Sequence, residues 1–534
     1  MDEFPVVFSG GGLVGLSTAM FLAQHGIPSL AIERLRAGSQ LPRAAFFHMR
    51  TLELFRSAGI EDEVRLRSLE EFEPEGSIVL MDTLAGTVLK GLVPDLNAGV
   101  DAFSPCRRLF LTQPGLEPIL RRRAEGTGAR VLDGHEVTAF EQDATGVTTS
   151  VKDLDTGKER TIRSKYLVGA DGAHSRVRDL AGIEFDGRGV FSNSVTIYFK
   201  APLARLLAGT NFSVIYIGNP HLGGFFRLDK DMNSGFLVVN TAGDTSKPEA
   251  SSPANDVREE TLIAHVRHAA GVPDLPVTIT GMARWRATSD VARRFRNNRV
   301  FLAGDAAHLM PPNGGYGGNT GIHDGHNLAW KLALVLKGIA GPGLLDTYDT
   351  ERRPAAAFTV EQAYTRYVTR TAPFLGKQDF QPLADDFDIE LGYLYSSSAI
   401  VSEGTGNTAG HEHPAESHGR PGSRAPHVWL EREGRRISSL DLYTGALTLV
   451  AGPEGAAFID AARQAASRIP GLRLETHQIG ADINDANDFL PAYGLSTPGA
   501  TLVRPDGFVA WREATVAADP AARLARAFDA ILSR

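Results

Sequence analysis

The chain has 534 residues, of which 43% are hydrophobic and 22% charged, enough for large buried cores in roughly three to four domain-sized units. A net charge of −8 argues against binding nucleic acid or anionic membranes, because both need a basic face, and the single cysteine, Cys106, excludes an internal disulfide and any CxxC motif. The acidic start and the lack of an apolar run of about 18 residues predict a cytoplasmic protein with no secretion signal and no membrane span.

Residues 4–33 predict a strand, a glycine turn, an apolar helix and a second strand. Gly10, Gly12 and Gly15 form a GxGxxG motif between the first strand and the helix, and Glu33 ends the second strand. The glycines allow a tight turn, close approach to a pyrophosphate and tight helix packing, while the carboxylate can accept ribose hydroxyls. The pattern therefore predicts a dinucleotide site, against the alternative of an ordinary glycine turn.

The segment after Glu33 offers further cofactor contacts. Arg34 adjoins the acid, Arg43 precedes a predicted helix over residues 49–58, and Arg50 lies in the first turn of that helix. Arg43 and Arg50 can each contact a cofactor phosphate or the dimethylbenzene side of a flavin, or be surface or capping residues. His48 is predicted to be a solvated loop histidine.

Two later segments repeat the logic of a strand that leads into a helix. Gln113 begins a predicted helix over residues 113–125, where its amide can reach a phosphate or simply cap the helix. Asp171 and Gly172 end an apolar strand and precede a helix, a context that favours more than an ordinary Asp-Gly turn.

Residues 186–285 contain β-branched and aromatic runs separated by turn residues, which predict an antiparallel sheet. Such a sheet, with peripheral strands from residues 70–101, can form one wall of an enclosed site. Its inward aromatic residues would be Tyr216, Phe225 or Phe226, and Trp285, although core packing is the alternative for each.

Residues 299–332 predict a strand (300–303), a glycine-rich loop (304–321) and a helix from about 322 to 337. Asp305 follows the strand, Pro312 stiffens the loop, and the loop glycines, Gly318 and Gly321 among them, let backbone lie against a planar ring. Asn319 and Thr320 would begin the helix, whose positive end favours negative charge. His323 and His326 are predicted to cap the helix or lie at the surface rather than bind a metal.

The C-terminal part follows a linker over residues 404–424. Its histidine-rich stretch, residues 411–418, is predicted to be a flexible polar loop, so the sequence predicts no metal site. Residues 427–534 predict two strands, a helix and a further strand, followed by the stretch 501–512 and a last amphipathic helix from about residue 520.

The GxGxxG motif with Glu33, the Asp-Gly at 171–172 and the Gly-Asp at 304–305 together resemble the single-component FAD-dependent aromatic hydroxylases, typified by para-hydroxybenzoate hydroxylase. The loop and helix at 311–333 and the stretch 427–455 are similar to the branch of phenol hydroxylases and aromatic-polyketide hydroxylases. The resemblance implies FAD contacts at Gly10, Gly12, Gly15, Glu33, Arg34, Arg43, Gln113, Asp171, Gly172, Asp305, Pro312, Gly318, Asn319 and Thr320.

The implied fold is α/β with an added antiparallel sheet: a Rossmann-like FAD-binding domain, an inserted β-sheet substrate domain and a C-terminal thioredoxin-like domain. We expect the FAD-binding domain over residues 1–73, 102–185 and 286–360, and the substrate-binding domain over 74–101 and 186–285. A helical segment and linker (361–424) lead to the thioredoxin-like domain (425–534), which lacks cysteine and so any dithiol chemistry.

The implied reaction is hydroxylation of a phenolic ring through a flavin hydroperoxide, with tightly bound, non-covalent FAD, O2, and NADPH or NADH as a transient reductant. No second GxGxxG unit exists for the nicotinamide. The catalytic residue stays unknown, with Tyr216, His221 and Arg227 as candidates, and a homodimer is expected.

The substrate is left open between a polycyclic polyketide-type phenol of antibiotic biosynthesis, which the small residues after Met310 favour, and a simple phenol of aromatic catabolism. A flavin halogenase is disfavoured because its WxWxIP stretch is absent. A non-catalytic flavin-binding partner protein remains an alternative of another class.

Overall fold

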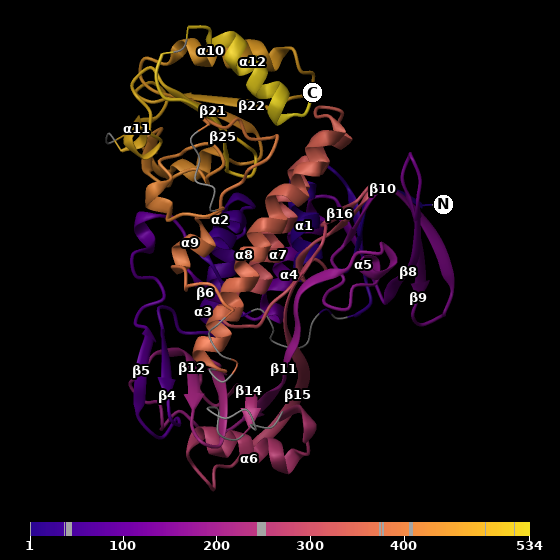
Figure 1. Ribbon diagram of the computed structural model, residues 1–534, viewed down its shortest axis with the longest axis vertical. Coiled ribbons are helices and arrows are strands. Elements are labelled where there is room, and N and C mark those ends of the chain that lie inside the picture. Colours follow the sequence, from indigo (N-terminus) through magenta and orange to yellow (C-terminus); the bar gives the residue numbers. More distant parts are fainter. Residues whose placement is uncertain are drawn as a thin grey trace.

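The computed structural model describes residues 2–36, 38, 45–242, 253–372, 375, 379–404, 410–485, 488–516 and 518–534. It is a mixed α/β fold with two eight-stranded sheets and a separate C-terminal sheet. Figure 1 shows the C-terminal domain at one end and the second large sheet at the other, with the helices α7 and α8 running between them. This confirms the predicted fold class, while Arg43 lies outside the described residues.

The first sheet is built mainly from parallel strands in the order β16-β17-β10-β1-β2-β7. Its central strands are buried and apolar, as a sheet covered on both faces requires. Because the carboxyl ends of parallel strands share one edge, the Gly10, Asp171 and Asp305 segments meet there. The bounds are β1 (Asp2–Ser9), β2 (Ser29–Glu33), β7 (Ala129–Asp133), β8 (His135–Gln142), β9 (Val147–Asp153), β10 (Glu159–Gly169), β16 (Arg296–Asn297) and β17 (Val300–Leu302).

Helices α1 (Leu13–Gln24) and α7 (Tyr316–Leu336) pack closely against each other beside this sheet. A Cβ on Gly321 would lie 2.6 Å from Cγ2 of Val14, and one on Gly325 would lie 2.2 Å from Oγ1 of Thr18. The predicted start of α7 near residue 322 is wrong, because the helix begins at Tyr316, almost two turns earlier. Its glycines do not break the helix, since their lack of a side chain lets α1 approach closely. Gly321 serves helix packing, not contact with a planar ring.

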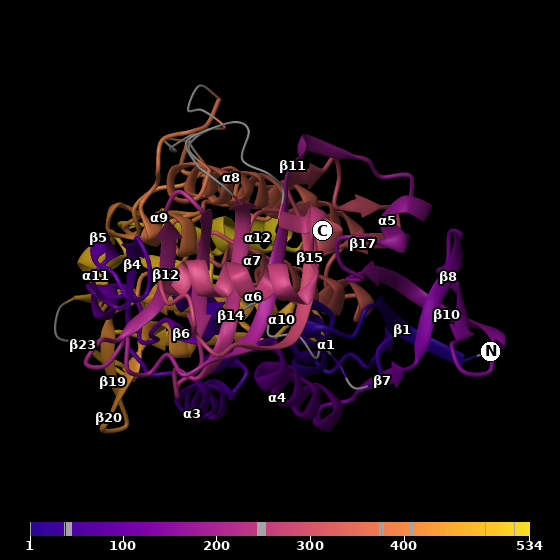
Figure 2. The same cartoon turned by 90° about the horizontal axis from the view of Figure 1, so that it is seen from below.

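The second sheet has the order β18-β15-β11-β14-β13-β12-β4-β5. Helix α6 (Glu259–Ala270) covers one face of this sheet, as Figure 2 shows from below, and its apolar residues share a buried core with Phe226. The early strands β4 and β5 thus lie at one edge of a sheet whose other strands come from residues 185–309. The bounds are β4 (Ser77–Met81), β5 (Val88–Val93), β11 (Phe185–Lys200), β12 (Phe212–Gly218), β13 (Leu222–Leu228), β14 (Ser234–Ala242), β15 (Thr278–Ala292) and β18 (His308–Leu309).

The remaining elements of the larger part join these two sheets. Strands β3 (Phe46–Phe47) and β6 (Leu109–Phe110) form a small antiparallel pair, and they precede α2 and α4. The helices are α2 (Met49–Ser57), α3 (Glu61–Glu71), α4 (Gln113–Gly126), α5 (Arg176–Leu180), α8 (Thr347–Arg370) and α9 (Asp386–Glu390).

The C-terminal domain has a four-stranded sheet in the order β22-β21-β24-β25, with β21 and β22 parallel and the other pairs antiparallel. Helices α10 and α12 pack together beside it, the thioredoxin-like arrangement. The bounds are β19 (Trp429–Arg432), β20 (Arg435–Ser438), β21 (Leu447–Ala451), α10 (Ala456–Ser467), β22 (Leu474–Gln478), β23 (Asn484–Asp485), α11 (Phe489–Ala492), β24 (Ala500–Val503), β25 (Val509–Glu513) and α12 (Pro520–Ile531). Among the described residues, no helix is both long and apolar enough to span a membrane.

Candidate active site

One cavity of 1870 Å³ is lined by residues of both large sheets, the start of α7 and the segment around α9. A site for a single ligand is usually about 300–1000 Å³, so this cavity has room for two. Ten of the residues predicted to bind the cofactor line it: Gly10, Gly12, Glu33, Arg34, Gln113, Asp171, Gly172, Asp305, Pro312 and Gly318.

The glycine turn opens helix α1 towards the cavity. Gly12 is the N-cap of α1, and no side chain caps the free N–H groups of its first turn. A Cβ on Gly10 would lie 2.2 Å from the carbonyl oxygen of Ala170, and one on Gly15 would lie 2.0 Å from that of Gly10. The lack of a side chain at Gly15 therefore lets α1 pack closely against the turn, while the open helix end suits a pyrophosphate.

Backbone N–H groups fix the acid of the dinucleotide motif. The Glu33 carboxylate accepts hydrogen bonds from the backbone N–H groups of Gly11 and Leu35, both at 2.8 Å. Arg34 and Gln113 line the cavity nearby, and Gln113 donates to Glu117 at 2.6 Å. Carboxylate lone pairs left over from the backbone contacts can accept ribose hydroxyls.

The Asp-Gly turn at residue 171 is held by its own helix. Ser175 donates to the Asp171 carboxylate at 2.5 Å and the Val177 N–H does so at 3.1 Å, and burial raises the pKa of Asp171. The same carboxylate lines the cavity together with Gly172. Asp305, at the end of β17, is an exposed residue that lines the cavity too.

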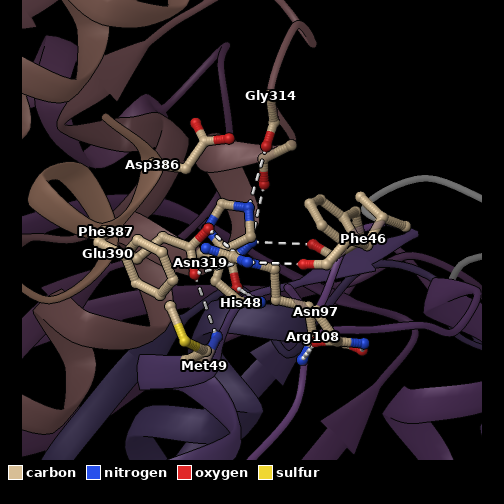
Figure 3. A network of polar contacts seen from close by, with 12 residues as sticks. Phe46, His48, Met49, Asn97, Arg108, Gly314, Asn319, Asp386, Phe387 and Glu390 are labelled. Atoms are coloured by element: carbon tan, nitrogen blue, oxygen red, sulfur yellow. Dashed lines mark hydrogen bonds and ion pairs between the residues drawn. The ribbon is translucent and has the colours of Figure 1, made fainter. Parts of the chain in front are cut away.

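Asn319 and Thr320 do not line the cavity. The Asn319 carboxamide accepts from the His48 N–H and donates to the carbonyl oxygens of Phe46 and Gly315, so it joins the β3 loop to the start of α7 (Figure 3). Thr320 donates to the carbonyl oxygen of Tyr316 within its own helix. The side chain of Asn319 thus shapes the loop at the cavity edge.

His48 is buried, not solvated as predicted. Its Nε2 lies 2.9 Å from the carbonyl oxygen of Gly314 (Figure 3), and burial, reinforced by Arg108, lowers its pKa to about 3. A neutral ring facing a carbonyl must carry its proton on Nε2, so His48 donates this hydrogen bond.

Two histidines of helix α7 also differ from the prediction. His323 and His326 lie within the body of α7, and burial lowers the pKa of both, to about 3 for His326. Arg50 turns away from the cavity and donates to Glu53 at 3.0 Å and to the carbonyl oxygen of Asp506 at 2.5 Å.

The second sheet supplies an aromatic wall to the cavity. Tyr216, Phe225 and Trp285 line it as predicted from the sheet pattern, whereas Phe226 packs on the opposite face. Arg227 lines it too. His221 lies outside the lining, at an exposed turn, where its ring stacks on His268 with the centroids 4.8 Å apart.

The segment at α8 and α9 contributes charged residues that the sequence did not single out. Arg370 lines the cavity and acts electrostatically on Tyr216, whose hydroxyl accepts from Asn313 at 3.3 Å. Arg366 pairs with Asp386 at 2.7 Å, and Asp386 accepts from the Tyr316 hydroxyl at 2.7 Å. The acidic run at 385–390 was the one local signal for this part of the site.

Glu390 forms a buried pair with Arg108 beside the cavity (Figure 3). The Arg108 Nε lies 2.8 Å from one carboxylate oxygen, and the Met49 N–H at the start of α2 donates to the other at 3.3 Å. Burial, helped by the charge of Asp386 and opposed by Arg108, raises the pKa of Glu390 to about 7.

A group of three possible metal ligands occurs among the described residues. Asp385, Asp388 and His413 bring ligand atoms within 4.8 Å of one another. His413 already accepts from the Ala415 N–H, and Asp385 caps α9 by accepting from the Phe387 N–H. We assign no metal to this group.

The residues fit FAD. A donor-rich helix end, a held carboxylate and a second uncapped helix end at Gly315, the N-cap of α7, all line one cavity. These features match the pyrophosphate, the ribose and the electron-rich flavin ring, in that order.

Comparison with known proteins agrees with this geometry. A family model described as an FAD binding domain matches residues 3–363, and one described as the C-terminal domain of aromatic-ring hydroxylases matches residues 418–534. A protein from Burkholderia sp. named 4-methyl-5-nitrocatechol 5-monooxygenase is 48% identical, over 100% of this chain and 98% of its own. The tetracenomycin A2 monooxygenase-dioxygenase of Streptomyces glaucescens is 38% identical, over 100% of this chain and 97% of its own.

A solved structure supports the same assignment. The crystal structure of aklavinone-11 hydroxylase in a ternary complex with FAD and aklavinone has a TM-score of 0.94 and 35% identity, with 100% of both chains covered. The chain therefore belongs to the FAD-dependent aromatic-ring hydroxylases, a family of flavin monooxygenases.

Proposed function

We propose that this protein uses NAD(P)H and O2 to hydroxylate a phenolic aromatic substrate. One observation carries the proposal: a single cavity joins the dinucleotide motifs to the aromatic wall of the second sheet. FAD, when bound, supplies the two-electron chemistry that NAD(P)H drives and that activates O2. The balanced reaction converts a ring C–H, O2, NAD(P)H and a proton into a ring C–OH, water and NAD(P)+.

We assign Gly10, Gly12, Glu33, Arg34 and Gln113 to the adenosine and pyrophosphate half of FAD. The second set, Asp171, Gly172, Asp305, Pro312 and Gly318, is assigned to the ribityl and ring half. All ten residues line the same cavity, which supports their assignment to one ligand.

Tyr216 is the residue that we assign to phenol activation. Its oxygen accepts a hydrogen bond from Asn313, and the positive charge of Arg370 acts on it; neither group can accept a proton from it. The hydroxyl proton of Tyr216 is then left to point to another acceptor. A phenolate oxygen of the substrate would accept it, and an electron-rich phenolate ring is the form that an electrophilic oxygen attacks.

The substrate is a phenol that can have more than one ring, because the cavity volume leaves room for such a molecule beside the cofactor. The relatives include both a nitrocatechol monooxygenase and monooxygenases named for tetracenomycin and aklavinone. A polycyclic polyketide-type phenol and a single-ring catechol are therefore the two classes to test. The cytoplasmic location, the homodimer and the exact domain boundaries stay predictions.

The experiment measures the anaerobic rate of FAD reduction by NADPH and by NADH, with and without catechols, nitrocatechols, naphthols and anthraquinone-type polyphenols. We expect one class to speed the reduction and to be hydroxylated when air is admitted. A Tyr216→Phe variant should still reduce FAD but lose about 100-fold in hydroxylation, the scale of acid–base assistance.

The control is Tyr443→Phe, which removes a hydroxyl that contacts Tyr493 in the C-terminal domain. It should leave hydroxylation unchanged. If FAD binds but no aromatic and neither nicotinamide leads to reduction, the protein is a non-catalytic flavin-binding partner and the proposal fails.

A further inference from the structure

Asp386, the first residue of α9, has a carboxylate oxygen that the protein does not use. Its Oδ1 accepts hydrogen bonds from the Arg366 guanidinium and from the Tyr316 hydroxyl, both at 2.7 Å. Its Oδ2 accepts none from the residues that the structure describes, and this atom is not buried. Because the side chain is 41% exposed and lines the cavity, the free oxygen is open to a ligand there.

The surroundings of Asp386 keep its carboxyl group ionised. Burial raises the pKa of this group, but Arg366, the Tyr316 hydroxyl, Arg108 and Arg370 outweigh burial, so the pKa lies below its ordinary value. A carboxylate of low pKa takes a proton poorly, yet it is a strong acceptor of hydrogen bonds. Asp386 is therefore suited to hold a hydroxyl group that keeps its proton.

Helix α8 brings this carboxylate close to the proposed phenol site. Arg366 and Arg370 are one turn apart on α8, a spacing at which two residues are neighbours on the same face of a helix. Arg366 binds Asp386, while the charge of Arg370 acts on both Asp386 and Tyr216. Asp386 and Tyr216 thus lie beside the same pair of arginines, and both line the cavity.

The other acid of α9 on the cavity wall, Glu390, does not offer a free oxygen of this kind. Arg108 Nε lies within 3.0 Å of both of its carboxylate oxygens, and the Met49 N–H donates to one of them (Figure 3). Its side chain is also buried. Of these two acids, Asp386 is therefore the one that can accept a hydrogen bond from a ligand.

We propose that Asp386 accepts a hydrogen bond from a second hydroxyl group of the aromatic substrate. This inference rests on the proposed function and names the feature that selects the substrate. Tyr216 and Arg370 favour one ionised oxygen on the ring, whereas Asp386 favours an oxygen that keeps its proton. The site then prefers the monoanion of a dihydroxylated ring to a ring with one hydroxyl group. A ribityl hydroxyl of FAD is the other donor of this chemistry.

The test measures dissociation constants on the oxidised FAD-loaded protein from the change in flavin absorbance, and hydroxylation rates in air beside them. The ligands within each set differ by one hydroxyl group: 4-nitrocatechol with 4-nitrophenol, and 2,3- and 2,7-dihydroxynaphthalene with 2-naphthol. FAD titration of the apoprotein is the second arm, and it separates the substrate from the cofactor as the donor.

The variant is Asp386→Asn, which has the same size as the parent residue. Its amide oxygen must take the place of Oδ1, because Arg366 and Tyr316 both donate there. The amide NH2 then replaces the free acceptor by a donor. The matched control is Asp388→Asn, which removes one charge from the same helix at a residue outside the described cavity lining.

We expect the parent to bind a dihydroxylated ligand about 10- to 100-fold more tightly than its monohydroxylated counterpart, the worth of a hydrogen bond to a charged group. Asp386→Asn should remove most of this preference and leave the affinities for the monohydroxylated ligands and for FAD nearly unchanged. Asp388→Asn should keep the preference. The preference of the parent needs no variant, so it tests the proposal even if Asp386→Asn does not fold.

Four outcomes would overturn the proposal. No preference in the parent would remove the site, and selective loss of FAD affinity in Asp386→Asn would assign the oxygen to the cofactor. Equal weakening of all aromatic ligands with a lower unfolding temperature would make Asp386 only a structural partner of Arg366. Unchanged dissociation constants with an equal fall in all hydroxylation rates would make it a proton acceptor. Failure of every aromatic to perturb the flavin would instead contradict the proposed function, on which the inference rests.

Discussion

Glu390 is a carboxyl group whose protonation changes near neutral pH. Burial raises its pKa from 4.5 to about 7, so the folded protein keeps a proton there that the unfolded chain loses near pH 4.5. Between these two pH values the folded state binds more protons, and the free energy of unfolding therefore falls as the pH rises. The full effect of this one group is about 3 kcal/mol.

We expect Glu390→Gln to remove that slope. The unfolding free energy of the parent minus that of the variant should fall by about 1–3 kcal/mol from pH 5 to pH 8. Denaturant titration at several pH values measures this difference. A stability difference that is the same at every pH would come from new partners of Arg108 in the variant, and it does not bear on the predicted pH dependence. A difference that stays the same across this range would show that Glu390 is ionised throughout.

At the scale of elements, the contact between α1 and α7 sets where the two helix ends meet the cavity. The two helices approach through Gly321 and Gly325, where a Cβ would overlap Val14 and Thr18. The uncapped starts of both helices face the same cavity, so their separation fixes the distance between the two halves of the cofactor site.

Gly325→Ala should destabilise the protein by about 1–3 kcal/mol, the usual result of overpacking, and weaken FAD binding at the same time. Gly126→Ala is the control, because Gly126 ends α4 with nothing within 4 Å of its added Cβ. That change should be neutral or stabilising. Unfolding midpoints and FAD titration of both variants check this, and equal midpoints would show that α1 and α7 separate easily.

At the scale of the whole molecule, buried charges join the C-terminal domain to the flavin-binding part. Arg504, between β24 and β25, binds the Glu351 carboxylate of α8 at 2.6 and 2.9 Å and also bonds to Asp506. Lys331 of α7 donates to Glu351 at 2.8 Å, and the Trp330 Nε1 donates to Asp506 at 3.1 Å. The C-terminal domain is therefore joined to α7 and α8 through these buried polar contacts.

Arg504→Met should destabilise the protein by about 3–5 kcal/mol, because it leaves Asp506 buried without its guanidinium partner. Arg107→Met, which removes half-exposed pairs with Asp101 and Glu75, should change stability by less than about 1 kcal/mol. Denaturant midpoints compare the two. Similar midpoints would mean that apolar contacts alone hold the C-terminal domain in place.

The motifs that lie within one strand, turn and helix were predictable from the sequence. Glu33 ends a strand, and Gly10, Asp171 and Asp305 each follow one. Parallel strands bring their ends to one edge whatever lies between them. The family resemblance added the expected order and bounds of the domains, which stay a prediction.

The residues that the sequence did not reveal depend on distant partners. Arg108 and Glu390 are 282 residues apart, and neither stands in a local pattern that signals the other. Asn319 was expected at the flavin ring, but its carboxamide is used by three backbone groups of two loops. His48 was read as solvated because loop composition does not reveal what covers a loop.

The contact between Arg504 and Glu351 also has a consequence in time. The two residues are separated by 153 positions, and a ribosome adding roughly 5–20 residues per second needs about 8–30 s to cover that distance. During this interval Glu351 and Lys331 lack the partner that the finished protein gives them. We expect the flavin-binding part of the nascent chain to be incompletely folded until the hairpin of β24 and β25 emerges from the ribosome. FAD should therefore bind near the end of synthesis.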